Sequence, residues 1–416
     1  MNNEGTKSPQ KEKDEARAHA DGPARVTLRS WARTHFGEAL AVRQSEPVGW
    51  RTIAVAALGM IVPVIAGVAL GHAEIGFTIG LGAMLLAGPT ATPDAEAAQE
   101  RRSPATAVLP AIVAVLAATA IAGHAWSDVA MVLLATTAAS VSGYSRPVGV
   151  AAIRFIVYFV LSLGLLDAAG SHRAGAALIF GLGALWNIVV RLMLSRKGPA
   201  PAEMAGAKAS PTHVQLCANW RRTMRELAGW QFPIRLGAGL AVASVARAAW
   251  PAHHYGWIVL TVALLTQRPL EHVPIKLTQR ALGTLLGVGL TWVALSSVSS
   301  TLALAALICL LAVLAPIARA RSYLAYASIS TPAILLVLDL EKPIETILLV
   351  DRLVATLAGA AIVIAANLAA DRWLPKPTPK AVRRRAPADG AGVQPSSTAS
   401  VSVEETSSPP VAGRSK

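Results

Sequence analysis

Long apolar runs, separated by short polar or basic connections, occupy most of this chain. Backbone in hydrocarbon must satisfy its own hydrogen bonds, so each run predicts a helix that crosses a bilayer. The runs lie at 52–70, 74–92, 105–122, 127–142, 149–167 and 174–194, and then at 232–249, 253–267, 281–298, 301–318, 323–338 and 347–370. Several are short for an apolar layer about 30 Å thick, so kinked helices or half-helices are expected. The pattern predicts an all-α, polytopic membrane protein with about twelve transmembrane helices.

The two sets of six runs resemble each other at an offset of about 180 residues. The matching residues are Gly49-Trp50 with Gly229-Trp230, Gly76-Phe77 with Gly256-Trp257, Tyr144 with Tyr323, Arg173 with Arg352, and Asn187 with Asn367. Because six is an even number, both sets begin on the same side of the membrane. The sequence therefore predicts two parallel six-helix repeats around a pseudo-two-fold axis along the membrane normal, with a substrate path on or near that axis.

Polar segments divide the chain into five parts. These are a tail at 1–24, a first membrane half at 25–195, a linker at 196–231, a second membrane half at 232–374 and a tail at 375–416. The tails are low in large apolar residues and are expected to be disordered. Residues 25–50 mix apolar side chains with arginine, which suits either a helix on the inner leaflet or an irregular linker. Within the 196–231 linker, Thr212–Gly229 has the spacing of an amphipathic helix.

Composition and charge support a membrane protein and fix its predicted orientation. Hydrophobic residues make up 53% of the chain and charged residues 15%. With both termini placed in the cytoplasm, 33 of the 38 lysines and arginines lie on the cytoplasmic side, as the positive-inside rule requires. The net charge of +14 is spread over the tails and loops, so it indicates attraction to anionic lipid rather than to nucleic acid.

Recognisable catalytic and metal-binding motifs are absent from the sequence. It has no phosphate-binding glycine loop ending in Gly-Lys-Ser/Thr, no metal-spaced cluster and no nucleophile elbow. The two cysteines, Cys217 and Cys309, are far apart and suggest packing roles. The chain is therefore not expected to be an enzyme or to need a metal or cofactor. The pair His253-His254 favours an interfacial location, with proton handling or substrate binding as the alternative.

One stretch carries a family resemblance. Residues 255–290 read YGWIVLTVALLTQRPLEHVPIKLTQRALGTLLGVGL, and residues 351–359 (DRLVATLAG) repeat the same spacing of arginine, threonine and glycine. Over about Phe232–Arg372 this pattern resembles the fusaric acid resistance (FUSC) family, which includes aromatic acid exporters, and the related plant aluminium-activated malate channels.

The resemblance implies a secondary exporter of small, aromatic carboxylic acids, driven by the proton gradient in a Gram-negative inner membrane. A passive anion channel is the alternative, and a membrane scaffold in an envelope assembly is a weaker one. Implied partners are a small anionic organic acid, the lipid bilayer and a periplasmic adaptor protein, and a homo-oligomer is compatible with the sequence. Larger relatives carry soluble domains that have no counterpart in this sequence.

Charged residues at membrane depth are the main site candidates, because each is costly unless a partner or ligand compensates it. Arg352 is the first candidate for binding an anion, and Arg154 is the second. The structural alternatives are an ion pair at the outer rim for Arg352 and snorkelling toward inner headgroups for Arg154.

Further candidates surround the same motif. Thr284 and Thr356 offer hydroxyl groups, Arg280 offers a charge, and Trp257 and Thr261 are candidates to line the path. The alternative for Gly283 and Gly287 is a helix-packing seam, and for Trp257 an aromatic belt.

The predicted proton-coupling residues are three acids that lie near Arg352 in the sequence. They are Asp339, Glu341 and Asp351. Coupled carboxylates would favour an exporter, whereas arginines without such acids would favour a channel.

Overall fold

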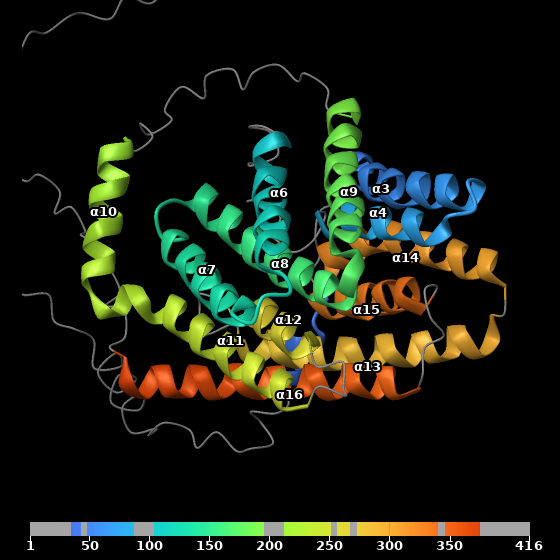
Figure 1. Ribbon diagram of the computed structural model, residues 1–416. Coiled ribbons are helices and arrows are strands. Elements are labelled where there is room, and N and C mark those ends of the chain that lie inside the picture. Colours follow the sequence, from blue (N-terminus) through green and yellow to red (C-terminus); the bar gives the residue numbers. More distant parts are fainter. Residues whose placement is uncertain are drawn as a thin grey trace, which may run out of the picture. The chain divides into compact units, whose positions relative to one another are not determined.

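The computed structural model describes residues 35–42, 48–86, 104–194, 212–250, 256–266, 273–298, 300–339 and 346–374. These residues form helices joined by short connections, and no strand occurs among them (Figure 1). The first-half helices are α3 (Trp50–Ala69), α4 (Ala73–Leu86), α6 (Pro104–Ile121), α7 (Ser127–Val141), α8 (Arg146–Ala168) and α9 (Arg173–Leu194). The second-half helices are α11 (Gln231–Ala249), α12 (Gly256–Leu265), α13 (Val273–Ser297), α14 (Thr301–Arg321), α15 (Tyr323–Asp339) and α16 (Thr346–Trp373).

Each predicted apolar run overlaps one of these helices. Within the described residues, six helical segments are long and apolar enough to cross a membrane: Trp50–Ala69, Arg146–Asp167, Gly170–Leu194, Leu227–Ala249, Leu302–Arg321 and Ile347–Trp373. Shorter apolar helices lie between them. The predicted all-helical membrane fold is thus confirmed at this level, and the number of crossings stays a prediction.

The described part of the polar connection between the runs at 253–267 and 281–298 is helical, from residue 273 onward. α13 begins at Val273 and contains Lys276 and Arg280. Hydropathy placed the start of this element at residue 281 because polar side chains lower the local average, although they do not interrupt a helix. Arg280 therefore projects from a continuous helix.

Helix packing follows the same pairing scheme in both halves. In the first half α4 packs on α3 and α9, α9 also contacts α3 and α6, and α8 contacts α6 and α7. In the second half α12 packs on α11 and α16, α16 also contacts α11 and α13, and α15 contacts α13 and α14. Between the halves, α7 meets α11 while α3 meets α14, and α8 meets α12 while α4 meets α15.

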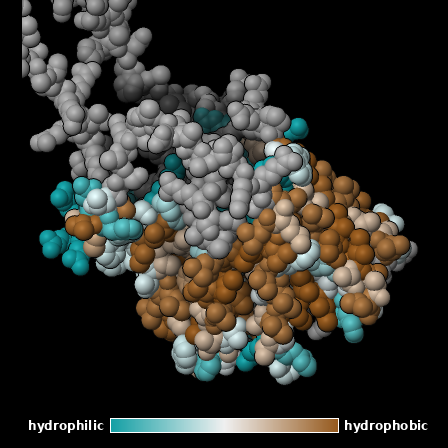
Figure 2. Space-filling model, turned by 90° about the horizontal axis from the view of Figure 1, so that it is seen from above, coloured by the Kyte–Doolittle hydropathy of each residue, from teal (hydrophilic) through white to brown (hydrophobic). Residues whose placement is uncertain are grey.

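Two apolar clusters form the core, and each contains residues from both halves. One cluster joins α6, α7 and α8 to α11 and α12, with Phe159 and Leu240 fully buried. The other joins α3 and α4 to α14 and α15 around Met60 and Ile308. Many large apolar side chains remain on the outside, such as Trp292 with 60% exposed, and Figure 2 shows a largely hydrophobic face. Such a surface suits contact with lipid.

The amphipathic segment of the linker forms α10 (His213–Arg225), followed by the short helix η2 (Leu227–Trp230). Thr212 and Gln215 form a capping box at its start, which satisfies backbone donors that the first turn leaves open. Trp220 donates a hydrogen bond to the Ser140 carbonyl at 3.1 Å, so α10 is attached to the end of α7.

Residues 35–42 and 48–50 are the described parts of segment 25–50, for which the sequence suits either a helix on the inner leaflet or an irregular linker. Residues 35–40 are helical and are tied to α13 by two hydrogen bonds. His35 Nε2 lies 2.9 Å from Thr278 Oγ1, and Gln279 donates to the Ala39 carbonyl at 2.9 Å. This helical segment therefore contacts α13 directly before Arg280.

Candidate functional site

Arg352 lies in the second turn of α16 and is almost completely buried, with 1% of the residue exposed. Its guanidinium carbon stands 3.7 Å from the centre of the Trp257 ring on α12. Nε, Nη1 and Nη2 have no hydrogen-bond partner among the described residues. The guanidinium is therefore held by an aromatic face and leaves all its donors available.

The packing of α12 on α16 brings these two residues together. Gly359 makes the close approach possible, because a Cβ there would lie 2.8 Å from the Thr261 Cβ and Cγ2 atoms and 3.2 Å from the Ile258 carbonyl. A cation over an indole face in a water-poor site is attracted by about 2 kcal/mol or more. Trp257 thus helps to hold Arg352 in place.

Arg280 contributes a second positive charge from α13. It is 4% exposed, its Nε has no hydrogen-bond partner within the described part of the chain, and its charge acts on Arg352. No ion pair to a carboxylate is found for either arginine in the described residues. Two like charges, neither of them in an ion pair with a carboxylate of the described residues, therefore share one region where α12, α13 and α16 meet.

The three predicted threonines are fully buried but differ in their bonding. Thr356 donates to the Arg352 carbonyl at 2.9 Å, so its hydroxyl supports the helix that carries the arginine. The hydroxyls of Thr261 and Thr284 have no partner among the described residues. A buried hydroxyl without a partner is costly, so these two are the better candidates for ligand contact.

Gly283 and Gly287 face α15. A Cβ on Gly283 would lie 2.5 Å from the Ala327 Cβ, and one on Gly287 would lie 2.8 Å from the Thr331 Cβ. Both glycines therefore serve close packing of α13 on α15, which is the seam that their spacing suggested.

Arg154 occupies a different position, on α8 beside Tyr158. It is 7% exposed and makes interactions within the protein. Its burial argues against a side chain extended to the headgroups.

The predicted proton-coupling acids are only partly described. Asp351 is 3% exposed and has an interaction partner. The side chain of Asp339, at the end of α15, and the whole of Glu341 lie outside the described residues.

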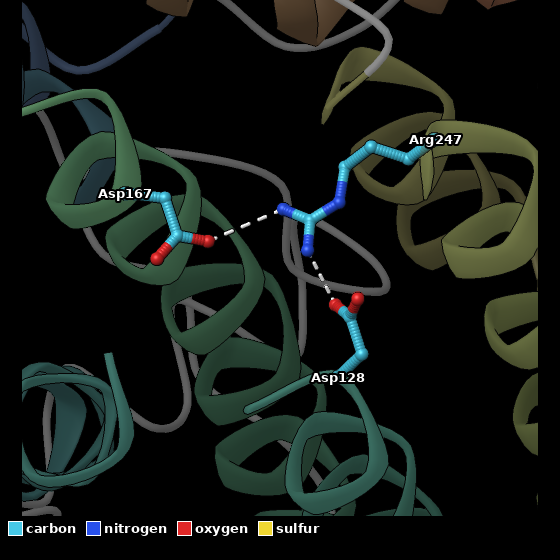
Figure 3. Close-up of polar contacts among 3 residues, drawn as sticks. All are labelled: Asp128, Asp167 and Arg247. Carbon is cyan, nitrogen blue, oxygen red and sulfur yellow. Dashed lines mark hydrogen bonds and ion pairs between the residues drawn. The ribbon is translucent and has the colours of Figure 1, made fainter. Parts of the chain in front are cut away.

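Two acids that the sequence analysis did not single out form a charged cluster with Arg247 of α11. Figure 3 shows the Arg247 guanidinium between Asp128 of α7 and Asp167 of α8. Nη2 lies 2.5 Å from Asp128 Oδ1, and Nη1 lies 3.2 Å from Asp167 Oδ2. The three side chains are separated by 80 and 119 residues along the chain, so no local motif reveals them. Their only sequence signal is that each is a charge at the end of an apolar run.

A small pocket lies elsewhere, between α6, α8 and α9. Apart from Ser162 its lining is apolar, with Phe180 and Leu166 among the contributors. It contains none of the predicted site residues, so the unpartnered arginine donors locate the chemistry better than this cavity does.

Comparison with known proteins gives one match. Residues 240–366 match the family described as fusaric acid resistance protein-like, which confirms the resemblance read from the sequence. The matched range contains Trp257, Thr261, Arg280, Thr284, Arg352 and Thr356. No curated protein and no solved structure matches the chain.

Proposed function

We propose, on the premise that residues 240–366 belong to the fusaric acid resistance protein-like family, that this multi-pass membrane protein transports small organic anions and that Arg352 binds them. The observation that carries the proposal is the buried Arg352 guanidinium, which has no hydrogen-bond partner in the described residues. Family membership supports a transport or efflux role in general. The residue assignments rest on the geometry.

A carboxylate supplies what Arg352 lacks. A buried charge without a partner costs several kcal/mol, and a guanidinium can bind a carboxylate through two parallel hydrogen bonds. The nearby positive charge of Arg280 adds to the attraction for an anion, and Thr261 and Thr284 offer hydroxyl donors. Trp257 gives the site an aromatic wall, which supports the proposal that aromatic acids are among the substrates.

The helix pairing supports two parallel repeats. Across the two halves, α8 of the first contacts α12 of the second, and α4 of the first contacts α15 of the second. A pseudo-two-fold axis between the halves would require such reciprocal contacts. The proposed substrate path follows this axis, with Arg154 on α8 as a second cationic contact.

Export driven by the proton gradient is the finer form of the proposal. Asp351, Asp339 and Glu341 are the proposed proton carriers, because acids at membrane depth that gain and lose protons can couple two fluxes. One observation favours a passive anion channel as the second candidate: no carboxylate is paired with Arg352 or Arg280 in the described residues.

The proposed partner is a periplasmic adaptor protein, and the proposed location is a cell inner membrane.

Both termini are proposed to lie in the cytoplasm. The positions of two arginines support this orientation. Arg235 donates to the Asn367 side chain at 2.8 Å and Arg191 donates to the Asn187 side chain at 2.7 Å. Both arginines lie toward the helix ends that are assigned to the cytoplasmic side, where positive charge is expected.

The test is a flux assay in proteoliposomes with benzoate as the probe, with and without an imposed pH gradient. Arg352→Ala should nearly abolish flux, and Arg352→Lys should raise the apparent KM because lysine keeps the charge but loses the two-pronged geometry. Arg221→Ala, at an exposed position of α10, is the matched control and should behave as wild type. Full flux in the Arg352→Ala protein would refute the assignment, and flux that ignores the pH gradient would select the channel.

A further inference from the structure

The Asp128–Arg247–Asp167 cluster joins the two membrane halves. Both acids come from the first half and the arginine comes from the second (Figure 3). In the proposed orientation, the start of α7 and the ends of α8 and α11 all lie on the outer side. The cluster therefore ties the halves together at the outer end of the α7–α11 junction.

Below the cluster, small residues line this junction. A Cβ on Gly237 of α11 would lie 2.5 Å from Thr136 Oγ1 of α7. Ala135 and Ala139 of α7 are fully buried in the same cluster as Ala243 of α11. The helices thus approach closely at these positions, where small side chains meet.

The equivalent junction between α3 and α14 has a different character. From residue 52 to 69 on α3 and from 301 to 318 on α14 there is no charged side chain. Met60 and Val64 of α3 share an apolar cluster with Ile308 and Leu311 of α14. Separating this junction would expose large apolar surfaces to a water-filled path, which is unfavourable.

Separating the ionic junction exposes groups that water solvates well. The side chains of Arg247, Asp128 and Asp167 are 25%, 32% and 28% exposed. Ion pairs that already touch solvent contribute little net stability, because hydration replaces most of the lost attraction. The two junctions therefore differ in how easily they open.

We propose that the Asp128–Arg247–Asp167 cluster is a reversible latch, and that the transporter opens to the outside by parting the outer end of the α7–α11 junction while the α3–α14 junction stays closed. This inference rests on the proposed transport function. It assigns to Arg247, Asp128 and Asp167 a positioning role, since none of them has to touch the substrate.

The first test locks the junction. Asp128→Cys and Arg247→Cys are combined in a Cys217→Ser, Cys309→Ser background and joined with a reducible bis-thiosulfonate reagent, because a direct disulfide is too short to replace a full arginine side chain. The locked protein should lose at least ten-fold in benzoate flux and regain it on reduction, whereas each single-cysteine variant should be insensitive to the reagent. Normal flux in the locked protein would overturn the latch.

The second test measures opening without a transport readout. Ser244 is buried on α11 one turn before Arg247, so Ser244→Cys reports access to the junction for a membrane-impermeant maleimide added outside. Adding Arg247→Gln should speed this labelling several-fold. The same change should leave Ala305→Cys, at the apolar junction, unaffected.

Equal labelling rates for Ser244→Cys with and without Arg247→Gln would also overturn the latch. Absence of benzoate flux in the wild-type protein would instead refute the proposed function. The labelling comparison would still decide whether the latch exists.

Discussion

Replacing Arg352 with methionine should make the ligand-free protein more stable while removing transport. Burying a charge without a partner costs several kcal/mol, and stacking on Trp257 recovers about 2 kcal/mol of this. Methionine keeps the length and apolar stem and removes both terms, together with the repulsion from Arg280. We expect the free energy of unfolding to rise by about 1–3 kcal/mol.

Arg235 is the matched control. It is also an arginine with 2% exposed, but it donates to Asn367 at 2.8 Å and to the Gln231 carbonyl at 3.2 Å. Arg235→Met would leave these acceptors unsatisfied and should destabilise the protein by about 1–3 kcal/mol. Both substitutions replace a buried arginine with methionine. Opposite signs of the change in the free energy of unfolding would therefore isolate the effect of hydrogen bonding.

The assay is a thermal unfolding series in detergent, read by the fraction of protein that stays monodisperse. Arg352→Met should raise the midpoint by about 2–5 °C. Benzoate at 100 times its dissociation constant should stabilise the wild type by about 2.7 kcal/mol and leave Arg352→Met unchanged. A midpoint that falls as far as that of Arg235→Met would show that Arg352 is a structural residue, and the reasoning would fail.

Two further predictions concern packing and topology. Gly359→Ala should lower the free energy of unfolding by about 1–3 kcal/mol, because the new Cβ overpacks Thr261. Gly289→Ala has nothing within 4 Å of its new Cβ and should leave the free energy unchanged or raise it by up to about 1 kcal/mol. Urea unfolding in detergent measures both. Cysteines placed between Ser296 and Ser300 should react with an impermeant maleimide outside intact cells, and a cysteine at Ser400 should not. Labelling of the Ser400 position would reverse the proposed orientation.

The helices were predictable from the sequence because lipid imposes a simple rule on apolar length. Each of the twelve predicted runs overlaps a helix, and the errors lie at polar ends such as the first two turns of α13. At these ends hydropathy reports that the side chains are polar, which does not tell whether the backbone is helical.

The side-chain partners were less predictable. A helix that is apolar all round gives no periodic signal about which face meets which neighbour. The sequence therefore left Trp257 open between the substrate path and an aromatic belt, whereas in the structure its ring lies against Arg352. Arg352 was expected near acids because Asp351 precedes it, yet adjacent residues on a helix point in different directions. Arg247 gave no sign of an ion-pair cluster, since its partners are on two helices that are distant in the sequence.

The reciprocal pairing of the helices is what a symmetric dimer of six-helix chains would produce, because a two-fold axis makes every contact occur twice. If such a dimer preceded the present chain, Arg173 and Arg352 descend from one position. Today they differ: the guanidinium of Arg173 occupies the space beside Gly123, where a Cβ would otherwise lie, in a turn with a φ of +78°, while Arg352 is buried against Trp257. Fusion into a single chain would have allowed one arginine to take a structural role while the other kept the proposed contact with the substrate.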